Sequence, residues 1–307
     1  MPSPLHTNSI VPTAPHPSAL PGAAAVNLFL TFFLISFIMN PKGALPLHFV
    51  IPTQQELNFM TLTEFFHEHP KAALGFSGGV DSSFLLWAGR QAGADIHPYY
   101  IKTAFQPEFE YQDALRLCRE LGAELTVLEL DALADPGVTA NPANRCYFCK
   151  VGLFGTLSRR ALADGYTVLL DGTNASDDAG DRPGMKALQE LQVLSPLRLC
   201  GLTKAEIRRQ SREAGLFTWD KPAYACLATR IPTGEEITLE KLQDTEKAEG
   251  YLFSLGFSDF RVRKLGNSAR IQLPEDQIPN LMAHRREILT ELKKYYKNVL
   301  LDLEVRL

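Results

Sequence analysis

The sequence has no excess of positive charge. Lys and Arg number 31 against 35 Asp and Glu, so the formal net charge is -4. Nucleic acids and anionic membrane surfaces attract proteins through basic fields or patches, and the chain has no long run of Lys or Arg. We therefore expect neither a nucleic-acid partner nor a membrane partner.

Cysteine is also scarce, with five residues among 307. An odd number spread thinly over a chain of this size is not the pattern of a secreted disulfide framework. We therefore expect a reducing compartment and a cytoplasmic protein.

The first 59 residues lack charge almost completely, because no Lys, Arg, Asp or Glu precedes Lys42. They contain an apolar run at residues 23–39, shorter than the ~20 residues that span a bilayer and interrupted by polar side chains. No basic segment precedes the run, as a secretory signal requires. We expect residues 1–59 to be a dispensable leader or to precede a natural start at Met60, with a short or tilted membrane span as the alternative.

From residue 60 onward, apolar segments alternate with helical stretches. The segments at 72–76, 96–101, 125–130 and 167–170 have the length of buried strands. This alternation predicts an α/β domain at residues 60–232, with a parallel sheet covered by helices on both faces.

After Gly234 the pattern changes. It predicts a helix at 239–255, strands at 259–265 and 269–273, a helix at 284–296 and a last strand at 299–307. We therefore expect a second, smaller α+β domain at residues 233–307.

The first predicted strand runs into "SGGVDSS", which has no lysine of the Walker type. A strand that ends in glycines before a helix directs backbone N–H groups at one point, which is an anion site. The lysine-free loop suits pyrophosphate as a leaving group and resembles the PP-loop of ATP pyrophosphatases. The resemblance implies ATP cleavage to AMP and pyrophosphate with Mg²⁺, for which Asp81 is a candidate ligand. The alternative is a plain glycine turn. The candidate ATP-binding residues of the loop are Ser77, Gly78, Gly79, Asp81, Ser82 and Ser83.

Asp171 in "LLDGTN" follows the last predicted strand of the sheet. Ligands of open parallel sheets bind beyond the carboxyl ends of the strands. Asp171 is therefore a further candidate for the nucleotide or Mg²⁺, and a helix-capping role is the alternative.

Three cysteines lie in motifs: Cys146 and Cys149 in "NRCYFCK", and Cys226 in "KPAYACLATRIPTG". A structural zinc site needs a fourth ligand, and a thioredoxin-like pair leaves Cys226 unused. Three thiolates suit a [4Fe-4S] cluster whose fourth iron can carry sulfide. Alternatively, Cys226 alone donates its sulfur.

The blocks "GFSGGVDSSFLL", "NRCYFCK", "LLDGTN", "GLTKAEIR", "TWDKPAYACLATRIPTGEEIT" and "GFSDFRVRKLGNSARIQL" resemble the LarE family, the sulfur transferases of nickel-pincer nucleotide biosynthesis, over residues 60–307. The resemblance implies that a carboxylate of pyridinium-3,5-biscarboxylic acid mononucleotide is adenylated and converted to a thiocarboxylate. It also implies a homo-oligomer, and the sulfur source is unknown. Because all three cysteines are present, we favour a [4Fe-4S] cluster over sacrifice of Cys226, which would leave dehydroalanine.

Arg261 and Arg263 alternate along a predicted strand, so both face one side, and guanidinium groups suit a phosphate monoester. By the resemblance they bind the substrate phosphate, with Arg230 nearer the reacting carboxylate and Glu249 orienting the arginines or a metal. Solvated strand arginines are the alternative. Gln272 stands where the family has Glu, which weakens the case for that metal.

Three other functions compete with the sulfur transferase. A tRNA thiolase would need a basic surface, an amidating ligase would need an ammonia source, and a non-catalytic ATP-binding scaffold would not need Asp81 and the three cysteines.

Overall fold

The computed structural model describes residues 60–177 and 182–306, so the expected leader lies outside the described residues. A sheet of four parallel strands has the order β3-β2-β1-β4. The strands are β1 (Lys71–Gly75), β2 (Asp95–Lys102), β3 (Thr126–Glu129) and β4 (Leu169–Leu170). Parallel strands place their carboxyl ends at one edge, so the segments after β1, β2 and β4 are neighbours. The predicted α/β fold with a parallel sheet is confirmed.

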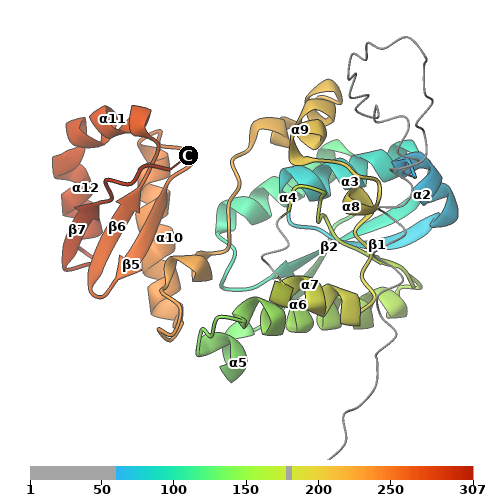
Figure 1. Cartoon of the computed structure of the whole chain (residues 1–307), viewed down its shortest axis with the longest axis horizontal. Helices are drawn as coiled ribbons and strands as arrows, with labels where there is room; N and C mark the ends of the chain where they lie inside the picture. The colour runs from blue at the N-terminus through green and yellow to red at the C-terminus, as the bar shows by residue number, and fades with distance from the viewer. Residues whose placement is uncertain (1–59, 178–181, 307) are drawn as a thin grey trace, which may run out of the picture. The chain divides into compact units, whose positions relative to one another are not determined.

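Alternate residues of β1 serve two cores on opposite faces of the sheet. Ala72 and Leu74 belong to one core, and Ala73 belongs to the other. Helices lie on both faces (Figure 1), as a sheet buried on both sides requires. One side carries α2 (Leu62–Glu68), α3 (Val80–Gln91), α4 (Glu108–Glu120), α8 (Pro196–Leu199) and α9 (Lys204–Glu213), and the other carries α6 (Arg145–Ala163) and α7 (Arg182–Glu190).

The short elements between these are α5 (Pro136–Thr139) and the 3₁₀ helices Ala132–Ala134, Phe217–Asp220 and Leu227–Arg230. Thr61 and Glu64 form a capping box at the start of α2. Within the described ranges, none of the helices combines the length and apolarity needed to cross a bilayer.

The remaining elements build a three-stranded sheet of order β5-β6-β7 with its own core. β5 and β6 are antiparallel, whereas β6 and β7 are parallel. The elements are α10 (Leu239–Ser254), β5 (Arg261–Leu265), β6 (Ser268–Gln272), the 3₁₀ helix Glu275–Gln277, α11 (Ile278–Ala283), α12 (Arg285–Leu292) and β7 (Asn298–Leu301). A second small sheet is thus present, and the domain boundary at residues 232 and 233 stays a prediction.

Two predicted elements of this region are wrong in extent. The helix expected at 284–296 begins, as α12, directly after its cap residue His284, but it ends at Leu292. The strand expected at 299–307 stops at Leu301, where its parallel pairing with β6 ends at Ile271. Beyond that point the segment keeps single backbone hydrogen bonds, from the Asp302 N–H to Ile271 and from the Arg306 N–H to Leu273.

Candidate functional site

The loop after β1 has a backbone that only glycine fits at one position. Gly78 has φ +70°, and a Cβ there would lie 3.0 Å from the backbone nitrogen of Ala114 in α4. Glycine adopts positive φ without steric cost, so Gly78 lets the loop turn against α4 before α3 begins at Val80.

Serine hydroxyls hold the loop together from inside. Ser77 Oγ and Ser82 Oγ are 3.0 Å apart, the Gly79 N–H donates to Ser77 Oγ at 3.3 Å, and the Ser82 hydroxyl donates to the Gly79 carbonyl at 3.3 Å. The N-cap residue of α3 is Gly79, which has no side chain to accept hydrogen bonds from the first N–H groups of the helix. The positive end of the α3 dipole and the first backbone N–H groups therefore remain available to an anion.

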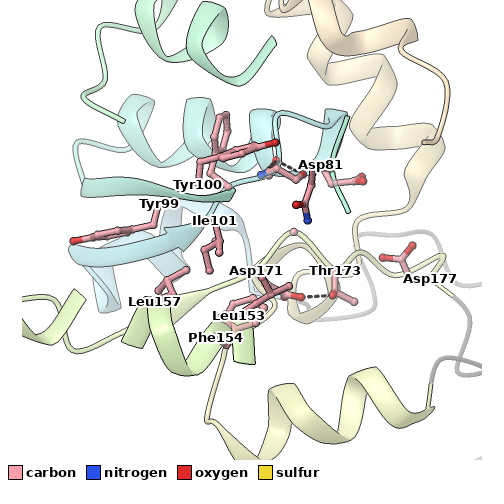
Figure 2. A pocket seen from close by; sticks show the side chains of 16 residues that line it. Asp81, Tyr99, Tyr100, Ile101, Leu153, Phe154, Leu157, Asp171, Thr173 and Asp177 are labelled. Atoms are coloured by element: carbon pink, nitrogen blue, oxygen red, sulfur yellow. Dashed lines mark hydrogen bonds between the residues drawn. The ribbon is translucent and has the colours of Figure 1, made fainter. Parts of the chain in front are cut away.

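A cavity of about 300 Å³ opens beside this loop at the carboxyl edge of the sheet. Figure 2 shows Asp81 on one side of it and Asp171 with Thr173 on the other. The hydroxyl of Tyr100, in the cavity wall, is buried and makes no hydrogen bond to the described residues, and the same is true of Ser83 behind the loop. The lining residues that carry polar side chains are Ser77, Asp81, Ser82, Tyr99, Tyr100, Gln106, Asp171, Thr173 and Asp177.

Asp81 is held between two distant segments of the chain. Lys204 Nζ lies 2.5 Å from Asp81 Oδ2, and Asn174 Nδ2 donates to Asp81 Oδ1 at 3.3 Å. Burial raises the pKa of Asp81, the ammonium of Lys204 opposes this, and the charge of Asp177 adds to it. A carboxylate at the wall of an anion cradle suits Mg²⁺, which binds one or two carboxylates together with phosphate oxygens. The predicted Mg²⁺ role of Asp81 is chemically consistent with this place and stays a prediction.

Asp171 accepts hydrogen bonds from the hydroxyls of Ser195, at 2.6 Å, and Thr173. It is buried, and burial raises the pKa of its carboxyl while the two hydroxyls lower it. Asp171 does not cap a helix, because residues 172–177 after it are not helical. Asp171 lies at the carboxyl end of β4 and lines the cavity, as its position in the sequence indicates.

Two lysines near the loop were missed at the level of sequence. Lys204 belongs to the capping-box segment at the start of α9, and Lys221 precedes Pro222. Lys221 Nζ lies 3.4 Å from the Gly78 carbonyl oxygen and 2.7 Å from Asp113 Oδ2. Two lysines therefore lie beside the loop, although they belong to segments more than a hundred residues away in sequence. The one sequence signal for them is that both lie in blocks that carry the family resemblance, "GLTKAEIR" and "TWDKPAYACLATRIPTGEEIT".

The three motif cysteines gather in one region and are partly buried. Cys149 and Cys226 pack against the same apolar cluster. Burial raises the pKa of the Cys149 thiol to about 12, with further increases from the charges of Cys226 and Cys146. Burial likewise raises the pKa of Cys226, which the charge of Arg145 opposes. The structure thus brings together the C-x-x-C motif and a cysteine about eighty residues later.

Helix α6 connects this region with the cavity. Cys149 and Leu153 are four residues apart, so they share one face of α6, and Leu153 and Phe154 line the cavity. On the other side, the Leu227 N–H donates to the Phe105 carbonyl at 2.8 Å, next to Gln106 of the cavity wall. Helix α6 and the segment Phe105–Gln106 thus connect the thiols with the cavity, while the residues that line the cavity include none of the three cysteines.

The segment that follows Cys226 is fixed by a buried ion pair. Arg230 Nε and Nη2 donate to the two carboxylate oxygens of Glu249 at 2.9 and 3.1 Å, and both side chains are at most 1% exposed. Arg230 Nη1 donates to the Ala225 carbonyl at 2.6 Å, and Glu249 also accepts from the Val262 N–H at 2.8 Å. Glu249 therefore orients Arg230, whereas contact of Arg230 with a substrate carboxylate stays a prediction.

Arg261 and Arg263 lie on β5 as predicted, and both reach backbone carbonyls of the cysteine segment. Arg261 Nη2 donates to the Ala223 carbonyl, and Arg263 Nη1 donates to the Thr229 carbonyl at 2.6 Å. Arg261 is only 5% exposed, so the alternative of a solvated strand arginine is wrong for it. Their phosphate-binding role stays a prediction.

Gln272 bridges the second sheet without a metal. It accepts from Arg263 Nε at 2.6 Å and donates to Asp302 Oδ2 at 2.7 Å. Over residues 60–177 and 182–306, no cluster of three or more His, Cys, Asp or Glu side chains is arranged to hold a metal ion. This applies both to the second sheet and to the three thiols.

An all-parallel α/β sheet whose first strand ends in an open Ser-Gly-Gly-x-Asp-Ser loop defines a nucleotide-binding protein of the PP-loop type. No family model matches the chain. The chain is 40% identical over 259 residues to an uncharacterized protein of Synechocystis sp., a match that covers 81% of this chain and 94% of the relative.

The chain is also 30% identical over 246 residues to pyridinium-3,5-bisthiocarboxylic acid mononucleotide synthase of Lactiplantibacillus plantarum, covering 79% of this chain and 89% of that enzyme. A more distant match, 26% identical over 205 residues, is the glutamine-hydrolyzing GMP synthase of Aeropyrum pernix, of which the match covers 38%. The chain belongs to the LarE-type family of pyridinium-3,5-bisthiocarboxylic acid mononucleotide synthases.

Proposed function

We propose that this protein is an ATP-dependent sulfur transferase. It adenylates a carboxylate of pyridinium-3,5-biscarboxylic acid mononucleotide, releases pyrophosphate and replaces AMP with sulfur to give a thiocarboxylate. The name of the Lactiplantibacillus plantarum relative supports the product. The observation that carries the proposal is helix α6, which bears Cys146 and Cys149 near its start and gives Leu153 and Phe154 to the wall of the cavity beside the phosphate cradle.

In the first step an oxygen of the substrate carboxylate attacks the α-phosphorus of ATP. The bond from that phosphorus to the oxygen that bridges to the β-phosphate breaks, and pyrophosphate leaves with the electron pair. The open N-terminus of α3 stabilises this leaving charge. Asp81 would help to hold Mg²⁺, which would supply further positive charge to the phosphate oxygens.

In the second step a sulfur nucleophile attacks the acyl carbon, the bond from carbon to the AMP oxygen breaks, and AMP leaves. If the nucleophile is Cys226, a thioester forms first. A base then removes the Cα proton of Cys226 and the Cβ–S bond breaks, which leaves dehydroalanine in the protein and a thiocarboxylate on the product.

The predicted [4Fe-4S] cluster on Cys146, Cys149 and Cys226 has suitable donor chemistry. The thiols of the described residues, however, are not arranged as a ligand group, and burial raises the pKa of Cys149 and of Cys226. The cluster stays a prediction, with sacrifice of Cys226 as the alternative, and the chemistry of the first step is the same for both.

The Cys226→Ala variant tests the order of the two steps. We expect it to release pyrophosphate from ATP and the pyridinium dicarboxylate nucleotide at a rate close to wild type, while thiocarboxylate formation falls below about one thousandth of wild type. Phosphate detection after pyrophosphatase and mass spectrometry of the nucleotide measure the two reactions. Release that requires tRNA would support the tRNA thiolase instead, and no release from wild type would support the scaffold.

Anaerobic purification and reconstitution separate the two sulfur sources. Iron and sulfide in the protein support the cluster, and loss of about 34 Da from Cys226 after one round, the mass of H₂S, supports sacrifice. The Cys146→Ser variant is expected to lose iron only if the cluster exists.

A further inference from the structure

Lys221 is a partly buried cation beside the phosphate loop. It follows the 3₁₀ helix Phe217–Asp220, and its side chain is 14% exposed. Its ammonium lies 3.4 Å from the carbonyl oxygen of Gly78, the residue whose positive φ shapes the loop, and 2.7 Å from Asp113 of α4.

The ammonium has a donor to spare. A lysine carries three N–H donors, and the described residues offer it two oxygen acceptors, Gly78 and Asp113. Because the Gly78 carbonyl belongs to the loop after β1, the ammonium stands beside that loop, and neither of the two acceptors uses its third donor.

The backbone at Lys221 is fixed before any ligand binds. Pro222 restricts the preceding residue to extended conformations, and Lys221 has φ -55° and ψ 125°. The aromatic ring of Phe109 lies 5.5 Å from the ammonium. Fixing the cation in advance reduces the entropy that binding a phosphate would cost.

Acidic side chains face the ammonium from α4. Asp113 pairs with it directly, and the charge of Lys221 also acts on the buried carboxyl of Glu110. These groups hold the lysine in the nucleotide-free protein, where a Walker lysine is absent from the loop itself. The arrangement has the features of a phosphate ligand supplied from outside the loop.

We propose that Lys221 binds the β- and γ-phosphates of ATP and the pyrophosphate that leaves, so that it takes the place of the lysine missing from "SGGVDSS". This deepens the proposed function and rests on its use of ATP. Cys226 follows Lys221 by five positions, so their Cα atoms are at most about 18 Å apart. One short segment thus connects the pyrophosphate ligand with the sulfur region.

Isothermal titration of the full chain with ATP, pyrophosphate and AMP, without the pyridinium nucleotide, tests the proposal. In Lys221→Met we expect the affinities for ATP and pyrophosphate to fall about 10- to 100-fold, since a charge-assisted hydrogen bond is lost. The affinity for AMP is expected to change less than about twofold, because AMP lacks the β- and γ-phosphates. Lys221→Gln keeps a donor for Asp113 and serves as a second variant if Lys221→Met does not fold.

Asp113→Asn separates ligand binding from a bracing role. It breaks the same ion pair but keeps the ammonium, so we expect it to bind ATP as well as wild type or more tightly. Equal losses in Asp113→Asn and Lys221→Met would show that the pair only braces α4 against the loop, and would overturn the proposal. Lys247→Met, at an exposed lysine of α10, controls for net charge.

Three results are distinguishable. Unchanged pyrophosphate affinity in both Lys221 variants overturns the inference and leaves the proposed function standing. A wild-type protein that binds neither ATP nor pyrophosphate overturns both. Lysine-dependent binding of ATP without thiocarboxylate formation supports the inference and contradicts the proposed substrate.

Discussion

The phosphate loop and the buried Arg230–Glu249 pair differ in whether their buried polar groups have hydrogen-bond partners. Near the loop, the hydroxyls of Ser83 and Tyr100 are buried without a partner among the described residues, and α3 starts without a side-chain cap. At the pair, every side-chain nitrogen of Arg230 and both oxygens of Glu249 have protein partners. The first region is prepared for a ligand, whereas the second is complete without one.

The difference has an energetic basis. A buried polar group without a partner costs about 1–3 kcal/mol, so a native protein keeps such groups mainly where a ligand or water satisfies them. A buried ion pair is stable only when its hydrogen bonds are also satisfied. Mutations should therefore affect folding at the pair and nucleotide binding at the loop.

The largest effect on stability is expected from Glu249→Gln. The substitution leaves the guanidinium of Arg230 buried without its counter-charge, which should lower the free energy of unfolding by about 3–5 kcal/mol. Urea denaturation followed by circular dichroism measures the change. Glu240→Gln, at an exposed position of the same helix, should change it by less than about 1 kcal/mol, and similar losses for the two variants would contradict the role assigned to the pair.

The Gly78→Ala variant tests the phosphate loop, where we expect a loss of both stability and ATP affinity. Ala at a positive φ costs about 1–2 kcal/mol, and here the new Cβ also meets the α4 backbone at 3.0 Å. Gly93→Ala is the matched control, because Gly93 has φ +79° with no heavy atom within 4 Å of the added Cβ. We expect Gly93→Ala to lower the free energy of unfolding without changing ATP affinity. Gly78→Ala should lower the free energy of unfolding by at least about 1 kcal/mol more than Gly93→Ala, and it should also weaken ATP binding. Equal stability losses and unchanged ATP binding in Gly78→Ala would contradict the close fit of the loop.

The smallest effect concerns Glu110, which lies between the two regions. Burial raises the pKa of its carboxyl to about 7, while Lys221 and Arg230 lower it. Because the folded protein binds this proton more tightly than the unfolded chain, stability falls as the pH rises from the unfolded pKa of 4.5 toward 7.

The Glu110→Gln variant should remove this pH dependence. Its stability relative to wild type should rise between about pH 5 and 8, by no more than about 3 kcal/mol at ~1.4 kcal/mol per pKa unit. Urea denaturation at unit intervals of pH measures it. A constant difference between the two proteins across that range would show that Glu110 titrates normally.

Local patterns were enough to predict the sheet, because each buried strand of a parallel sheet is a short apolar run that needs no information from its partners. They failed at 284–307, where the length of β7 depends on how many of its residues pair with β6. The residues of a segment do not show whether a partner strand lies beside it.

Sequence by itself determined the chemistry of the loop and the identity of the thiols, since glycine at a positive φ, a helix N-terminus and cysteine have properties that do not depend on distant residues. Only the tertiary structure decided which charges stand beside them. Lys204 and Lys221 reach the loop from segments 123 and 143 residues away, and Arg230 is paired with Glu249 inside the protein. Such contacts arise from the packing of distant elements, and side-chain charge alone cannot specify them.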